Sequence, residues 1–65
     1  MDKHKLKAAM KGDKFNALER ILGVKRVAIS RRLNGHMDFE LSEIQKIAKH
    51  YDFSEQQINE IFFAS

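Results

Sequence analysis

Apolar residues recur along this chain at intervals of three and four, which places their side chains on one face of a helix. No segment alternates between apolar and polar residues in the way that a half-buried strand does. The pattern therefore predicts an all-α fold of five short helices around one small core. We expect these helices over residues 3–11, 14–22, 25–33 and 41–51, and from residue 55 toward the end of the chain.

The residues expected in the core share the apolar face of each helix. The first three helices contribute Leu6, Met10, Phe15, Ala17, Leu18, Ile21, Leu22, Ile29 and Leu33. The last two contribute Leu41, Ile44, Ile47, Ala48, Tyr51, Ile58, Ile61 and Phe62. Residues 36–39 are expected to form a loop between them.

Short-range signals mark where these helices begin and end. A glycine follows each of the first three helical segments, where helices commonly end on a left-handed residue: Gly12, Gly23 and Gly35. Asp13 is predicted to cap the second helix, because its carboxylate can accept a hydrogen bond from a free backbone N–H. Ser54, with Gln57 three residues later, forms a capping-box pattern that predicts the start of the last helix.

The length of the chain, 65 residues, predicts a single domain over residues 1–65. A chain this short buries only about 60% of its unfolded surface, so a partner subunit would add stability. Cysteine is absent from the sequence, which excludes disulfides and thiolate metal sites and is compatible with a cytoplasmic setting. Neither a membrane span nor a signal peptide is expected, because apolar runs are too short and the first residues are charged.

Charge is divided unevenly along the chain. Residues 1–37 carry a balance of +7, whereas residues 38–65 carry −4, which together give the net charge of +3. Uneven charge also occurs in small proteins without functional meaning. Here it favours a basic half that faces phosphate and an acidic half that faces solvent or a partner.

The stretch over residues 18–35 carries the strongest functional signal. It is interpreted as two short helices joined by a tight turn at Gly23, and the second of them is basic. This layout is typical of a helix-turn-helix, here over about residues 14–34, that places its second helix in the major groove of DNA. The sequence therefore predicts DNA binding.

The basic helix divides into an inward face, with Ile29 and Leu33, and an outward face that suits base recognition. Arginine can pair bidentately with guanine, and an exposed valine suits a thymine methyl group. The residues predicted to contact bases are Arg26, Val27, Ser30 and Arg31. Lys25 and Arg32 are better placed for phosphates, which position a protein without reading sequence. The alternatives are a solvated basic face and a valine that packs against the preceding helix.

Several motifs occur in the order found in one known family. Residues 22–24 read Leu-Gly-Val, and residues 28–35 read Ala-Ile-Ser-Arg-Arg-Leu-Asn-Gly. They are followed by Ile-Ala-Lys at 47–49 and Phe-Ser-Glu at 53–55. From about residue 6 to residue 63, the chain resembles the lambda-repressor-like helix-turn-helix family of Cro/cI or XRE type. It is similar to small phage and prophage regulators.

The resemblance implies a repressor that binds a palindromic operator in double-stranded DNA as a homodimer, at the nucleoid of a bacterial host cell. It matches Arg26, Val27, Ser30 and Arg31 to the base-facing positions of the family. Asn34 and His36 match the following loop, which meets the phosphate backbone, and Lys14 lies at the start of the second helix, where phosphate is also favoured. Two positions depart from the family pattern: Glu19 replaces a small residue and Phe15 replaces a glutamine. A one-residue shift of the second helix could explain both.

Other chemistry is weakly supported by the sequence. His4, His36 and His50 lack the spacing of zinc ligands. Asp38, Glu40 and Glu43 flank a helix start, where negative charge is favoured by the helix dipole. No nucleophile and base occur together, and a helical domain of this size leaves little room for a substrate cleft. We expect no enzyme activity, no cofactor and no metal.

Phe62 and Phe63 cannot both face the same side of a helix. One is expected to close the core, and the other to be exposed or to be buried in a partner, which suggests a dimer interface at this end. The alternative is that both pack internally. Two other functions stay open beside the repressor: a protein-interaction module of antitoxin or anti-repressor type, and a non-specific DNA-binding protein.

Overall fold

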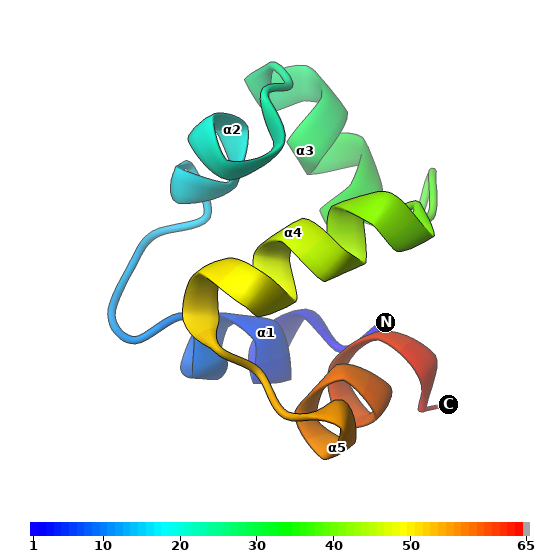
Figure 1. Ribbon diagram of the computed structural model, residues 1–65. Coiled ribbons are helices and arrows are strands. Elements are labelled where there is room, and N and C mark those ends of the chain that lie inside the picture. The colour runs from blue at the N-terminus through cyan, green and yellow to red at the C-terminus, as the bar shows by residue number, and fades with distance from the viewer. Residues whose placement is uncertain (65) are drawn as a thin grey trace.

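The periodic apolar positions form short helices in the computed structural model, which describes residues 1–64 (Figure 1). The helices are α1 (Lys3–Ala9), α2 (Ala17–Leu22), α3 (Arg26–Leu33), α4 (Leu41–Tyr51) and α5 (Glu55–Ile58), and α5 continues into the π-helix η1 (Asn59–Phe63). No strand occurs in this part of the chain. The radius of gyration, 10.6 Å, is close to the about 10.7 Å expected of a compact domain of this length. The prediction of an all-α fold with five helices is confirmed.

Helix α4 crosses the middle of the molecule (Figure 1). Helices α2 and α3 lie on one side of it, and α1 and α5 lie on the other. The two ends of the chain lie close together, because the Asp2 amide donates a hydrogen bond to the Ile61 carbonyl at 2.7 Å. This arrangement leaves α2 and α3 together on one side of α4.

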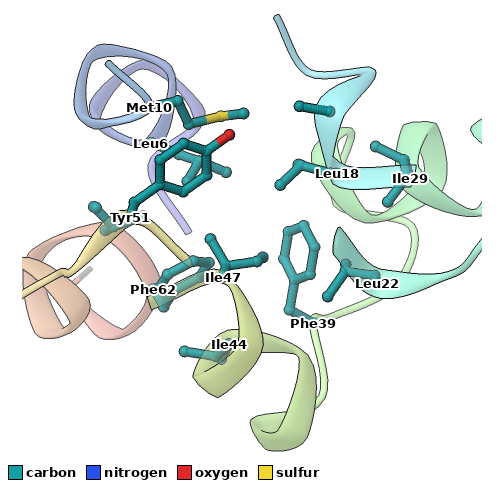
Figure 2. Close-up of a cluster of buried hydrophobic side chains, with 12 residues drawn as sticks. Leu6, Met10, Leu18, Leu22, Ile29, Phe39, Ile44, Ile47, Tyr51 and Phe62 are labelled. Carbon is teal, nitrogen blue, oxygen red and sulfur yellow. The ribbon is translucent and has the colours of Figure 1, made fainter. Parts of the chain in front are cut away.

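The buried side chains of the core come from α1, α2, α3, α4 and η1, and α5 contributes only the partly buried Ile58 (Figure 2). The fully buried members of the core are Leu6, Met10, Leu18 and Ile47, all predicted from the sequence. Phe39 was not predicted, because it lies in the loop before α4. Its ring nonetheless points into the cluster and meets the Phe62 ring edge-on at 5.8 Å. A loop residue of this kind has no periodic neighbours that could reveal its burial.

Leu41 was predicted to be buried, and this prediction is wrong, since its exposed fraction is 63%. It lies in the first turn of α4, at the margin of the apolar stripe that Ile44, Ile47 and Tyr51 form further along the helix. The loop before α4 already sends Phe39 into the core at this end of the helix. Leu41 is therefore left at the surface.

The predicted cap of the second helix is also wrong. Helix α2 begins at Ala17, after a turn in which the Ala17 amide donates to the Lys14 carbonyl at 3.0 Å. This turn separates Asp13 from the helix. The Asp13 carboxylate instead accepts a hydrogen bond from the Tyr51 hydroxyl at 2.7 Å. The side chain therefore joins the loop after α1 to the end of α4.

The other helix ends follow local rules. The Ser54 hydroxyl accepts from the Gln57 amide at 3.1 Å and the Gln57 side chain accepts from the Ser54 amide at 2.9 Å, so the predicted capping box is confirmed. Helix α4 begins with a similar contact, in which Glu43 accepts from the Glu40 amide at 2.9 Å.

Across the described part of the chain, no helix has the length and apolar character needed to cross a bilayer.

Candidate nucleic-acid interface

Helices α2 and α3 form a helix-turn-helix with its turn at Gly23. The Glu19 carbonyl accepts hydrogen bonds from the Gly23 amide at 2.9 Å and from the Val24 amide at 3.2 Å, which ends α2. Lys25 is extended, and α3 begins at the next residue. The turn at Gly23 is thus present where the sequence predicted it, whereas α2 begins three residues later than predicted.

Gly23 is required by its backbone conformation rather than by space. Its φ angle is +69°, and a methyl group at its Cα would meet no atom within 4 Å. The left-handed conformation costs other residues about 1–2 kcal/mol. The turn, and with it the placement of α3, therefore depends on the freedom of a glycine at this position.

Helix α3 turns one buried side chain inward and four polar or apolar side chains outward. Ile29 is buried in the core, whereas the predicted base-contacting residues are all exposed: Arg26, Val27, Ser30 and Arg31. The exposed fraction of Val27 is 69%, so this side chain does not pack against α2. An apolar side chain thus stands among arginines on a surface without any core role.

Arg32, although it belongs to the same helix, is held inside the fold. Its Nε donates to Glu43 Oε1 and its Nη2 donates to Glu43 Oε2, both at 2.9 Å, which makes a bidentate ion pair. Its Nη1 donates to the Ala28 carbonyl at 2.9 Å. The exposed fractions of the Arg32 and Glu43 side chains are 10% and 11%. The structure therefore separates Arg32 from the other arginines of α3.

The ion pair changes the ionisation of Glu43. Burial by itself would raise the pKa of this carboxyl group. Hydrogen bonds from Arg32 and from the Glu40 amide, together with the positive charge of Arg32, outweigh burial and hold the pKa below its ordinary value of 4.5. Glu43 therefore stays ionised at neutral pH and keeps its ion pair with the Arg32 guanidinium.

A hollow of about 550 Å³ runs beside α3 and brings several predicted contacts together. It is lined by Lys14, Arg26, Ser30 and Asn34, of which the Asn34 side-chain amide donates to the Ser30 hydroxyl at 3.2 Å. Phe15, Ile29 and Leu33 supply apolar lining. Lys25, Val27, Arg31 and His36 are exposed but lie outside this lining.

Lys3 also lines this hollow and was not predicted as a site residue. It lies in the first turn of α1, far from α3 in sequence. The hollow thus has lysines from α1 and from the loop before α2, beside Arg26 of α3. The positive balance of residues 1–37 was the one sequence signal for this residue, and that signal could not distinguish it from the other lysines.

Phe15 and Glu19, the two departures from the family pattern, both lie beside this hollow. Each side chain is partly buried and contributes to its lining. The buried residues of α2 are instead Ala17, Leu18 and Leu22. The small residue of α2 that faces the core is therefore Ala17, two positions before Glu19.

The chain end has a second, apolar surface. Phe62 is buried against Phe39, whereas the exposed fraction of Phe63 is 57%. The two adjacent rings therefore lie on different sides of the helix, one in the core and one at the surface. Phe63 lines a hollow of about 310 Å³ together with Met1 and Met37, which are also exposed. Three exposed apolar side chains from distant parts of the sequence therefore meet at one place, which we call the terminal patch (Met1, Met37 and Phe63).

The histidine and acidic residues of the described chain do not form a metal site. Within residues 1–64, no three of these side chains are placed so that they could hold a metal ion. Asp38, Glu40 and Glu43 lie at the start of α4, where the Glu43 carboxylate accepts hydrogen bonds from the Glu40 amide and from Arg32. The chemical character of the surface around α3 is that of exposed cations and hydrogen-bond donors.

A comparison with known families agrees with this geometry. The model of the BetR domain matches residues 1–61, which include the helix-turn-helix and the helices that support it. No curated protein and no solved structure matches the chain. The BetR domain is a regulatory helix-turn-helix domain that binds DNA, so the predicted class is confirmed, while the narrower likeness to Cro/cI stays a prediction. The chain therefore belongs to the BetR-domain family of helix-turn-helix DNA-binding regulators.

Proposed function

We propose that this protein is a sequence-specific transcriptional regulator that inserts α3 into the major groove of an operator. The observation that carries the proposal is the outward face of α3, where Arg26, Val27, Ser30 and Arg31 are exposed directly after the Gly23 turn. None of these side chains is needed to fill the core. A helix of this kind can enter the groove without any change in the fold.

The chemistry of the four side chains suits base recognition. Arg26 and Arg31 each offer a planar fork that pairs with guanine O6 and N7, worth about 1–3 kcal/mol of discrimination. Val27 can contact the methyl group of thymine, and the Ser30 hydroxyl can donate to a base or a phosphate. The proposal thus accounts for an exposed valine that neither stability nor solubility requires.

Phosphate contacts are proposed on both sides of α3. The residues are Lys14, Lys25, Asn34 and His36, as the sequence suggested, and Lys3, which the hollow beside α3 adds. Arg32 is left out of this set, since its fork is bound to Glu43. Lysine side chains at the edge of such a groove strengthen binding to every sequence and make it depend on salt.

We further propose that the protein binds as a homodimer through the terminal patch, and represses by occluding a promoter in the manner of small phage regulators. Three exposed apolar side chains at one place are unusual on a surface this small and favour burial against a second copy. A two-fold dimer would present two copies of α3 to a palindromic operator at the nucleoid of a bacterial cell.

The decisive experiment is selection of bound sequences from a random duplex library at near-physiological salt. We expect a palindromic motif, and we expect the Arg31→Ala variant to lose information at one position of each half-site. Arg20→Ala is the matched control, because Arg20 is an exposed arginine on α2 and lines a different hollow. Its motif should equal that of the unmodified protein.

Other outcomes of the selection contradict the proposal in different ways. Binding without an enriched motif, which weakens steeply as salt rises, would indicate a non-specific DNA-binding protein. Absence of binding to any duplex would favour the protein-interaction module instead. A motif that is identical for Arg31→Ala would remove this residue from base recognition.

The dimer is tested separately by sedimentation. Phe63→Ala should shift the protein toward the monomer, because it removes the largest side chain of the terminal patch. Leu41→Ala is the matched control, since Leu41 is equally exposed but does not line the same hollow. A dimer that is unchanged by Phe63→Ala would exclude this side chain from the interface.

A further inference from the structure

We propose that Glu43 determines how selectively this protein reads DNA, although it lies on α4 and is nearly buried. It does so by binding Arg32, which fixes the end of α3 and keeps one cation away from phosphate. The inference rests on the proposed function. Glu43 is a positioning residue, which acts through Arg32 and touches no base.

Glu43 and Arg32 form a nearly buried contact between α3 and α4. Both oxygens of Glu43 are engaged by the fork of Arg32 at 2.9 Å, and Oε1 also accepts from the Glu40 amide at 2.9 Å. The third contact of Arg32, from Nη1 to the Ala28 carbonyl, holds the guanidinium along its own helix. One nearly buried group therefore connects the last turn of α3 to the first turn of α4.

Helix α3 has few other contacts that hold it on the core. Ile29 is its only buried residue, and Leu33 is partly buried at its end. With one buried and one partly buried apolar side chain, a short helix can still rotate about its axis or tilt. A planar, bidentate pair restricts both motions, because it fixes direction as well as distance. Base recognition needs this restriction, since a bidentate contact tolerates little misplacement.

The ion pair also neutralises one of the three arginines of α3. Without Glu43, the Arg32 guanidinium would lose its bidentate partner and become an unpaired cation on the same helix as Arg26 and Arg31. An additional cation near DNA increases affinity for all sequences alike, because it contacts phosphate. The ion pair therefore raises selectivity in two ways, by aligning the reading side chains and by withholding a non-selective contact.

The two effects predict a distinctive result for Glu43→Gln. Affinity for a duplex of unrelated sequence should rise, with a salt dependence steeper by about 0.9, the value for one added phosphate contact. The ratio of the affinity for the operator to the affinity for an unrelated duplex should fall on the order of tenfold. Residues in contact commonly have coupling energies that correspond to a fold-change of this order. A residue with a merely structural role would weaken both affinities together.

The matched control is Glu55→Gln, which removes the same charge from an exposed position at the start of α5. It accounts for the general gain in DNA affinity that follows from losing any carboxylate. The double variant Arg32→Met/Glu43→Met provides a second measurement, because replacing a buried pair by apolar side chains preserves stability in many proteins. We expect it to lose selectivity but to keep the salt dependence of the unmodified protein.

Each outcome decides the inference. If Glu43→Gln matches Glu55→Gln in selectivity and salt dependence, Glu43 has no such role. If Glu43→Gln fails to fold, a double variant with unimpaired selectivity overturns the inference. If Arg31→Ala loses the operator preference while both Glu43 variants keep it, the proposed function stands and this inference fails. If the unmodified protein shows no preference at all, both fail.

Discussion

Helices α3 and α4 are neighbours in sequence, but they are held in the fold by different forces. Helix α4 buries Ile44, Ile47, Ala48 and Tyr51, together with Glu43, along its eleven residues. Helix α3, with eight residues, buries Ile29 alone. The exposed side of α3 includes a valine and two arginines that are proposed to contact DNA. No DNA contact is proposed for the exposed side of α4.

The difference shows how a small domain divides stability and recognition. Side chains that face a ligand cannot also fill the core, so a recognition helix is poorly anchored by burial. In α3 backbone and polar contacts at the two ends compensate for this: the Gly23 turn before the helix and the Arg32–Glu43 pair in its last turn. Helix α4 needs no such support, because burial of its apolar stripe supplies most of its stability.

The largest expected effect tests this division directly. Ile47→Ala on α4 should lower the free energy of unfolding by about 2–5 kcal/mol, because it removes a fully buried side chain and leaves a cavity. Val27→Ala on α3 should change it by less than about 0.5 kcal/mol, since Val27 is at the surface. Urea denaturation of both variants measures the contrast. Comparable losses in the two helices would contradict it.

An intermediate effect is expected where α2 meets α3. Gly23→Ala should destabilise the protein by about 1–2 kcal/mol, because alanine must adopt a left-handed conformation there. Thermal unfolding measures this cost. Ala28→Gly, within α3, gives a comparison in which glycine is introduced instead of removed. An unchanged midpoint for Gly23→Ala would mean that the turn can rearrange without loss.

The smallest expected effect concerns the end of α4. Tyr51→Phe removes the hydrogen bond to Asp13 and should cost about 1 kcal/mol at neutral pH, because the partner carboxylate is exposed to water. Burial, the hydrogen bond to Asp13 and the charge of that carboxylate raise the pKa of Tyr51 to about 12. The folded state thus favours the neutral phenol more than the unfolded chain does.

The stabilisation from Tyr51 is complete below pH 10.0, the ordinary pKa of tyrosine, and is lost as the pH rises toward 12. The difference in unfolding free energy between the unmodified protein and Tyr51→Phe should therefore shrink over this range. Since Tyr51 is the only tyrosine, its ionisation can be followed by ultraviolet absorbance in the same samples. A constant difference would refute the assigned hydrogen bond.

Most of the fold could be predicted because its signals are local. The boundaries of α4, the turn at Gly23 and the capping box at Ser54 each depend on residues within a few positions of one another. The outward face of α3 followed from the position of Ile29 and Leu33 on the helix. The start of α2 was misplaced because Asp13 has a good capping side chain but its true partner, Tyr51, lies 38 residues away.

The candidate site was predicted only in part, for the same reason. Exposure of Arg26, Val27, Ser30 and Arg31 follows from helical periodicity, so the sequence was sufficient for them. Arg32 looks equivalent in the sequence, and only the approach of α4 reveals that Glu43 binds it. Lys3 likewise looks like any lysine of α1 until the chain folds and places it beside α3.

Most helices, the glycine turn and the outward face of α3 could be inferred from the sequence alone, because periodicity and backbone dihedral angles act over a few residues. The tertiary structure decided which side chains meet: Phe39 with Phe62, Tyr51 with Asp13, and Arg32 with Glu43. These pairings depend on how the helices pack, and packing is settled by the shape of the whole core. The division between reading arginines and an anchoring arginine on α3 is therefore a property of the folded molecule.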